Sequence, residues 1–73
     1  MQPLRILEGA VGNSVLIRLK YQNFEIRGTL RSYDTHLNVC LENAEQNLEE
    51  SQSSKKLGDI ILRGDNIIFI SPS

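Results

Sequence analysis

Two short polar corners carry most of the residues that could do chemistry in this 73-residue chain. The first corner, residues 33–38, holds the only histidine, His36, close to the carboxylate of Asp34 and the amide of Asn38. The second corner, residues 63–66, supplies an arginine, a glycine, an aspartate and another amide. Each corner lies between two apolar runs. We therefore expect two connections between strands that meet in space and bind something flat and polar.

A histidine near an aspartate suggests catalysis, but the sequence offers no complete catalytic set. Asp34 and His36 are two residues apart, so on a strand they would share a face. No serine, cysteine or second carboxylate can be assigned as their nucleophile or proton partner. One histidine without companion ligands makes a poor metal site, and isolated glycines form no phosphate-binding loop. We expect no enzymatic activity and no cofactor.

Binding of a nucleobase suits these residue types better. Single-stranded RNA is recognised by stacking its bases on flat side chains and by hydrogen bonds to their edges. His36 and Arg63 are flat, and Arg63 adds a cation that also suits phosphate. The amide of Asn38 offers a donor and an acceptor, which match the edge of uracil. Asp65 could accept a hydrogen bond that fixes Asn38 or Arg63.

The same residues also suit ordinary turns. Asp34 is a common turn former, His36 could be an exposed turn residue, and Asn38 could lie on a strand edge. An Arg-Gly-Asp run is typical of a hairpin turn. Residue types alone therefore leave both interpretations open.

Composition excludes some classes of protein. The net charge is −1, which excludes a globally basic nucleic-acid binder but not a local cationic patch. A single cysteine, Cys40, forms neither an internal disulfide nor a zinc site, and we expect a small apolar side chain in a reduced protein. No leader and no apolar run of roughly twenty residues are visible, so we expect a cytoplasmic protein without a membrane partner.

The elements that position the corners follow from apolar periodicity. Pro3 suits the start of a helix, and a helix of about two turns is expected over residues 3–10. Alternation with a period of two predicts strands over residues 14–20, 24–31 and 37–44. Gly28 lies in the core-facing series of the second strand, where we expect a sharp bend. Residues 45–54 lose the alternation and are predicted to form an exposed acidic loop.

The last two apolar runs differ from the earlier ones. Residues 55–62 and 66–71 are expected to pair around the second corner, and their centres are apolar on both faces. Strands of this kind are covered on both sides, and an exposed apolar edge would aggregate. A small domain also buries only roughly 60% of its unfolded surface, which favours oligomerisation. The pattern predicts a mostly β fold: a short N-terminal helix, then a strongly bent five-stranded antiparallel sheet, a small open barrel that assembles into a ring.

Both corners, with their flanking residues, resemble known motifs. Residues 33–39, preceded by Phe24 and by Gly28-Thr29-Leu30, are similar to the first Sm motif, and residues 61–67 resemble the second. The His-x-Asn and Arg-Gly-Asp combination is similar to the archaeal Sm-like (LSm) proteins. The resemblance implies one Sm-like domain over residues 1–73, with the first motif at about 14–44 and the second at about 55–71.

In this family the resemblance implies a homomeric ring, closed by pairing the fourth strand of one subunit with the fifth strand of the next. Seven subunits are usual and six occur. The two corners line the central pore, which holds one base of oligouridine per subunit. The implied partners are uridine-rich single-stranded RNA, other copies of the chain and RNA-processing proteins. The implied roles are a base sandwich for His36 and Arg63, recognition of uracil for Asn38, and support for Asp34, Gly64 and Asp65.

The sequence departs from some family members at two positions, and one alternative function remains open. Some relatives have an outer RNA contact made by an arginine, a histidine and a tyrosine, where this chain has Gln2, Glu8 and Tyr33. Tyr33 is therefore the single candidate for a secondary RNA contact. The alternative function is a scaffold ring that recruits protein partners through its helix or acidic loop, with RNA binding incidental.

Overall fold

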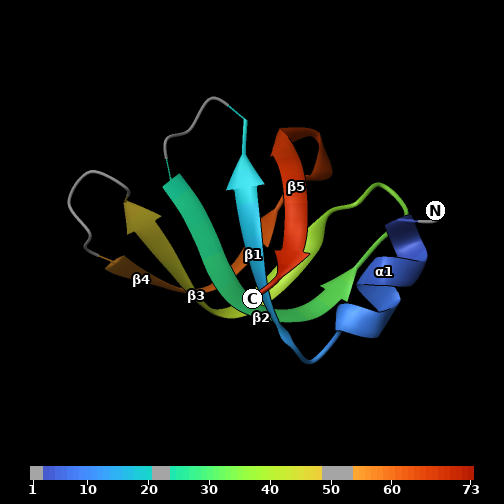
Figure 1. Cartoon of the computed structure of the whole chain (residues 1–73), viewed down its shortest axis with the longest axis horizontal. Helices are drawn as coiled ribbons and strands as arrows, with labels where there is room; N and C mark the ends of the chain where they lie inside the picture. Colours follow the sequence, from blue (N-terminus) through green and yellow to red (C-terminus); the bar gives the residue numbers. More distant parts are fainter. Residues whose placement is uncertain (1–2, 21–23, 49–53) are drawn as a thin grey trace.

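The computed structural model describes residues 3–20, 24–48 and 54–73, which form a short helix and a strongly bent five-stranded sheet (Figure 1). The elements are α1 (Pro3–Ala10), β1 (Ser14–Leu19), β2 (Phe24–Tyr33), β3 (Val39–Leu48), β4 (Ser54–Leu62), the 3-10 turn η1 (Gly64–Asn66) and β5 (Ile67–Pro72). Every pairing is antiparallel, and the strand order is β4-β3-β2-β1-β5. The predicted fold class is confirmed.

The helix begins at Pro3, as predicted, and packs at one end of the sheet (Figure 1). Its Leu7 is buried in the core. After the helix, Gly12 adopts a φ of 88°, which favours glycine, and its N–H donates to the carbonyl of Leu30 at 2.8 Å. The N–H of Leu30 in turn donates to the carbonyl of Asn13 at 3.0 Å, so the helix end is fixed to β2. Among the described residues, no helix is long and apolar enough to cross a membrane.

The core lies mainly beneath β1, β2 and β3. Its residues in β1 and β2 lie at even spacing, as the period of two predicted, whereas β3 departs from this spacing between Leu41 and Ala44. The core residues are Leu7, Val15, Ile17, Ile26, Leu30, Val39, Leu41 and Ala44. Burial of this apolar surface is the main favourable term in folding. The inner strands are therefore stabilised within the single chain.

The bend of the sheet depends on Gly28. A Cβ at this position would lie 3.2 Å from the Cα of Ala44 and 3.3 Å from the carbonyl oxygen of Glu42. The register between β2 and β3 also shifts between Arg27 and Thr29. The two strands therefore approach each other closely where the sheet curves, which agrees with the bend predicted at this glycine.

The prediction for the third strand was wrong at both ends. Leu37 has a φ of 62° and lies in the preceding turn, so β3 begins at Val39. The strand continues through residues 45–48, which were predicted to be loop, because β2 pairs with it on one side and β4 on the other. Asn43, with a φ of 53°, lies within a register shift that interrupts the alternation. The rest of the predicted acidic loop, apart from residue 54, which starts β4, lies outside the described residues.

The expected pairing of the last two strands was also wrong. β4 pairs with β3, whereas β5 crosses to the far side of the sheet and pairs with β1. Apolar residues on both faces indicate how much of a strand is covered, but they do not specify its partner. As a result, β4 and β5 are the two edge strands of the sheet.

Candidate functional site

The first corner is organised around the carboxylate of Asp34. Its Oδ1 accepts the backbone N–H of His36 at 2.8 Å and that of Asn38 at 3.1 Å. The N–H of Asp34 donates to the carbonyl of Asn38, and the N–H of Leu37 donates to the carbonyl of Asp34, both at 3.1 Å. These bonds hold Leu37 in a left-handed conformation that is unfavourable for a leucine. Asp34 is therefore the turn former that its residue type suggested.

The hydrogen bonds to Asp34 also favour its charged form. The side-chain amide of Asn38, followed by the backbone N–H groups of Asn38 and His36, lowers the pKa of the Asp34 carboxyl below its ordinary value. Asp34 is consequently a carboxylate at neutral pH, and it acts in this corner only as an acceptor.

The second corner is the 3-10 turn that separates β4 from β5. The N–H of Asn66 donates to the carbonyl of Arg63 at 3.0 Å and closes the turn. The carbonyl of Asn66 accepts the N–H of Lys20 at 2.7 Å, which ties this corner to the end of β1. Arg63 is thus placed by the turn backbone, with its guanidinium exposed.

The two corners meet, as expected from the sequence. The N–H of Gly64 donates to Oδ1 of Asn38 at 2.8 Å. A Cβ on Gly64 would overlap the carbonyl oxygen of His36 and lie 2.8 Å from the carbonyl carbon of Leu37. Only a glycine allows such an approach. Sequence reasoning named Gly64 as a supporting residue but missed its N–H as the donor that joins the corners.

Asn38 is held at both ends of its amide. Its Nδ2 donates to Oδ2 of Asp34 at 2.9 Å, while its Oδ1 accepts the N–H of Gly64. Of the two contacts considered for Asp65, the structure shows the one to Arg63, with 3.3 Å between Oδ2 and Nη2. Both of these side chains are exposed, at 64% and 76%, so their ion pair orients the arginine more than it stabilises the fold.

Five residues from the two corners line one open hollow: His36, Asn38, Arg63, Gly64 and Asp65. The hollow combines an imidazole, a guanidinium and an amide, which can stack on a flat ring and form hydrogen bonds to its edge. Tyr33 is half-buried at the end of β2, opposite Val39, and Cys40 is half-buried in β3. Within the part of the chain that the structure describes, no three His, Cys, Asp or Glu side chains are grouped as metal ligands.

Comparison with known proteins gives one family. The family model described as the LSM domain matches residues 5–72. A protein from Pyrococcus furiosus that is named as an snRNP Sm-like protein is 46% identical to this chain over 72 residues. The match covers 99% of this chain and 92% of that protein.

Solved structures agree in fold as well as in sequence. A heptameric archaeal Sm protein superposes with a TM-score of 0.86 at 40% identity, covering 94% of this chain and 97% of that one. The Sm protein of Pyrococcus abyssi, solved in complex with a uridine heptamer, gives a TM-score of 0.88 at 41% identity and full coverage of both chains.

Proposed function

The chain belongs to the LSM domain family, and from that premise we propose that it is one subunit of a homomeric ring that binds uridine-rich single-stranded RNA at a central pore. The ring serves RNA processing or metabolism as part of a ribonucleoprotein and catalyses no reaction. One similar archaeal Sm protein is a heptamer, and the similar Sm protein of Pyrococcus abyssi was solved in complex with a uridine heptamer. A ring of seven copies is accordingly preferred over one of six.

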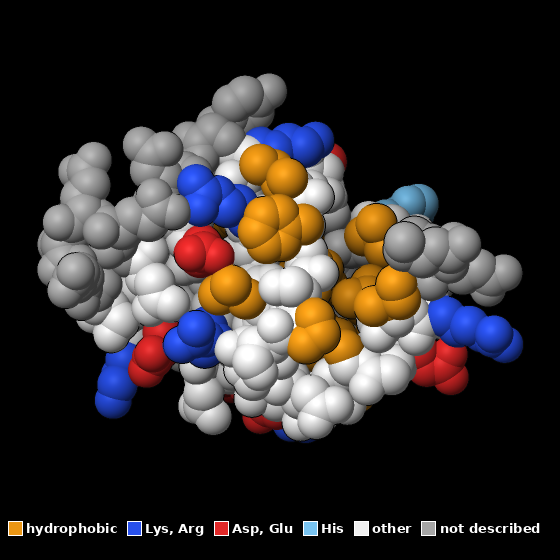
Figure 2. All heavy atoms as spheres, viewed as in Figure 1, with side chains coloured by type: hydrophobic (Ala, Val, Ile, Leu, Met, Phe, Trp, Pro, Cys, Tyr) orange, Lys and Arg blue, Asp and Glu red, His pale blue; other side chains and the backbone are white. Residues whose placement is uncertain are grey.

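The edge strands support assembly. Ile61 in β4 is 73% exposed and Ile68 in β5 is 58% exposed, although both are large apolar side chains. Figure 2 shows hydrophobic side chains gathered on the face where β5 runs in Figure 1. Edge strands with such surfaces favour pairing with another chain. Since β4 and β5 are the two opposite edges of one sheet, pairing β4 of one copy with β5 of the next repeats head to tail and can close into a ring.

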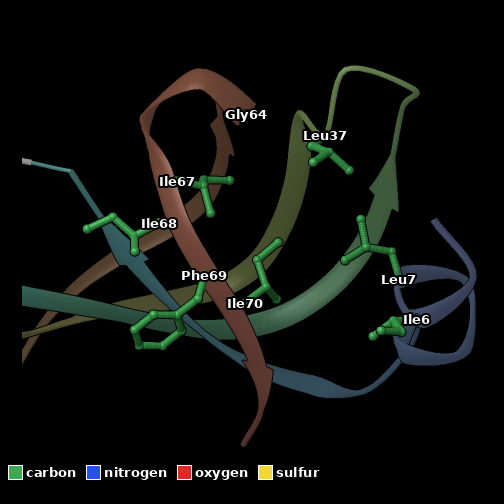
Figure 3. Close-up of a pocket in the computed structure, with 8 residues that line it drawn as sticks. All are labelled: Ile6, Leu7, Leu37, Gly64, Ile67, Ile68, Phe69 and Ile70. Carbon is green, nitrogen blue, oxygen red and sulfur yellow. The ribbon is translucent and has the colours of Figure 1, made fainter. Parts of the chain in front are cut away.

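An apolar hollow beside β5 also supports assembly. It lies between the strand and α1 and is lined by Ile6, Leu7, Leu37, Gly64 and residues 67–70. Figure 3 shows the side chains of Leu7, Leu37 and Ile70 pointing into this space, and the side chains of Ile68 and Phe69 on β5 are exposed. A second chain that pairs with β5 would therefore cover apolar side chains that are exposed in the single chain.

The observation that carries the RNA proposal is the position of Asn38 between the two corners. Its amide is fixed by Asp34 and Gly64 while it lines the same hollow as His36 and Arg63. In the proposed complex, His36 and Arg63 stack on the two faces of a base, and Asn38 bonds the edge of uracil. Asp65 orients Arg63 through their ion pair. Tyr33 is at most a secondary contact.

Repetition around a ring resolves the apparent conflict between an acidic protomer and an RNA ligand. Each copy has a net charge of −1, but each also brings an exposed Arg63 to the corner. A ring places as many of these guanidinium groups around one pore as it has subunits, and they form a focused positive site for phosphates. The assembled protein, and not the single chain, provides the binding surface.

Binding of short oligouridines and oligoadenines to three variants tests this proposal. Asn38→Ala should reduce the preference for uridine, because it removes the edge contact. Arg63→Ala should weaken binding of every sequence and reduce its salt dependence, because it removes a cation. His36→Ala should weaken binding by removing one stacking surface. Unchanged uridine binding in all three variants would reject the site.

The rival function is a scaffold ring in which RNA binding is incidental. It predicts the same assembly, so ring formation alone does not distinguish the two. A scaffold ring would bind oligouridine weakly, without base preference and independently of Asn38, His36 and Arg63. The same titrations therefore separate the two functions.

A further inference from the structure

We propose that Asp34 sets the preference of the pore for uracil over cytosine, by fixing which way the amide of Asn38 points. The inference rests on the proposed function, because it concerns the same nucleobase site. It assigns to Asp34 a role beyond bracing the turn: Asp34 is a positioning residue that acts on the RNA through Asn38.

The two partners of Asn38 allow only one orientation of its amide. A backbone N–H can only donate, so the atom of Asn38 that faces Gly64, at 2.8 Å, must be the oxygen. A carboxylate can only accept, so the atom that faces Oδ2 of Asp34, at 2.9 Å, must be the nitrogen. Rotating the amide by half a turn would place donor against donor and acceptor against acceptor. The lowered pKa of Asp34 keeps its carboxyl in the accepting form.

The fixed amide keeps half of its hydrogen-bonding capacity free for a ligand. One of its two N–H groups is used by Asp34, and one of the two lone pairs of its oxygen is used by Gly64. One N–H and one lone pair remain, and Asn38 lines the open hollow. The site therefore presents a donor beside an acceptor in a single, fixed order.

That order distinguishes the two pyrimidines. Uracil presents the O4 acceptor beside the N3–H donor, so it can take the free N–H and the free lone pair of Asn38 together. Cytosine placed in the same way presents an amino donor beside the unprotonated N3 acceptor, which opposes both groups. One bidentate contact of this kind discriminates by roughly ten-fold or more. A freely rotating amide could turn to suit either base, and the discrimination would be lost.

Asp34 itself is outside the set of residues that line the hollow, which are His36, Asn38, Arg63, Gly64 and Asp65. Its three side-chain hydrogen bonds go to the chain: two to backbone N–H groups through Oδ1, and one to Asn38 through Oδ2. An effect of Asp34 on base preference would therefore pass through its neighbours in the corner, and Asn38 is the one whose side chain it contacts. This separates its role from that of a direct contact.

Asp34→Asn is the sharpest test, because it retains the shape of the side chain. Its oxygen can still accept the two backbone N–H groups that form the turn. Its new amino group would face Nδ2 of Asn38, so the amide of Asn38 opposes either residue 34 or Gly64 in each of its two orientations. We expect the ratio of affinities for oligouridine and oligocytidine of equal length to fall toward one. Fluorescence anisotropy at one salt concentration and a pH above 7, where cytosine is unprotonated, measures this ratio.

Three further variants serve as comparisons. Asp34→Ser removes the contact to Asn38 without opposing the amide, so the bond from Gly64 should preserve part of the preference. The affinity ratio of Asp34→Ser should lie between those of the wild-type protein and Asp34→Asn. Asp65→Asn removes the same charge from a residue that contacts Arg63, and should alter both affinities alike while the ratio stays at the wild-type value. Asp59→Asn removes an exposed carboxylate on β4 that accepts the N–H of Asn43 at 3.3 Å, and should leave both affinities unchanged.

The outcomes separate this inference from the proposed function. A reduced ratio in Asp34→Asn, with the wild-type ratio in Asp65→Asn, supports it. A wild-type ratio in Asp34→Asn, while Asn38→Ala loses the preference, overturns the inference and leaves the proposed function in place. A wild-type protein that binds neither oligomer, or both equally, overturns the two together. Circular dichroism and native mass confirm that each variant is folded and assembled, and the Asp34→Ser ratio decides the matter if Asp34→Asn is unfolded.

Discussion

The inner strands and the edge strands of this sheet both contain isoleucine and leucine, but they use these side chains differently. Ile17 in β1 is fully buried, whereas Ile61 in β4 is 73% exposed. The inner strands alternate between a covered and an open face, and their core is complete within one chain. The edge strands β4 and β5 have apolar residues on both faces and leave several of them exposed.

This difference divides the molecule into a part that specifies the fold and a part available for assembly. Each part contains one of the polar corners: the first corner connects the inner strands β2 and β3, and the second connects the edge strands β4 and β5. Their contact through Gly64 is formed within the single chain. The proposed pocket is therefore already shaped in the protomer, and in the proposed ring it would be repeated once per subunit.

The largest effect on folding should come from the inner strands. Ile17→Ala leaves a cavity in a fully buried position and should lower the free energy of unfolding by roughly 2–5 kcal/mol. Urea denaturation measures this change. Ile61→Ala is the matched variant on an edge strand, and its effect should shrink as the protein is diluted, because it acts through assembly. Equal, concentration-independent losses would contradict the division into two parts.

A smaller loss is expected where the corners meet. Gly64→Ala would force the corners apart, because its Cβ overlaps the carbonyl oxygen of His36, and should lower the free energy of unfolding by about 1–3 kcal/mol. It should also abolish the preference for uridine. Gly9→Ala is the control, because a Cβ there meets nothing within 4 Å and the residue lies in α1. Thermal melting and oligouridine titration measure the two effects. Equal melting temperatures and equal uridine affinities for Gly64→Ala and Gly9→Ala would show that the contact between the corners is unimportant.

A charge on an edge strand should affect assembly more than folding. Ile61→Lys places a cation at a side chain that is exposed in the protomer, so the fold should persist while pairing with another copy is opposed. Val11→Lys is a control at another exposed apolar residue, which lies just after α1. Size-exclusion chromatography should show smaller species for Ile61→Lys alone. Intact assemblies in Ile61→Lys would show that this edge is not an interface.

The smallest effect should be a dependence of stability on acid pH at the first corner. The pKa of Asp34 is lowered, mainly by the side-chain amide of Asn38, so the folded protein binds the proton more weakly than the unfolded chain does. Its contribution is present above the ordinary pKa of a carboxyl and is lost as pH falls through the lowered pKa. Asp34→Asn should remove this part of the pH profile of the melting temperature. An unchanged acid limb would contradict the assignment.

Much of the fold was predictable because its signals are local. The alternation along β1 and β2 predicted one covered face for each strand, and the buried residues Val15, Ile17, Ile26 and Leu30 follow that alternation. The partner of β5 was not predictable in this way, because pairing with β1 joins segments far apart in the sequence. A period of two describes one strand and carries no information about which strand lies beside it.

The candidate site was also predictable only in part. Residue types located both corners and indicated Asp34 as a turn former. They did not indicate that Leu37 adopts a left-handed conformation, which leucine rarely does and which the surrounding hydrogen bonds maintain. They also did not reveal the N–H of Gly64 as the partner of Asn38, because any non-proline residue has such a group.

Native mass spectrometry of the wild-type protein, alone and with a short oligouridine, tests the central claim most directly. The account predicts one closed oligomer of defined size, with seven subunits preferred, and a complex in which this oligomer binds oligouridine but Arg63→Ala rings bind it weakly. A stable monomer at micromolar concentration, with or without oligouridine, would contradict the account, because the shared pore and its repeated corners would not exist.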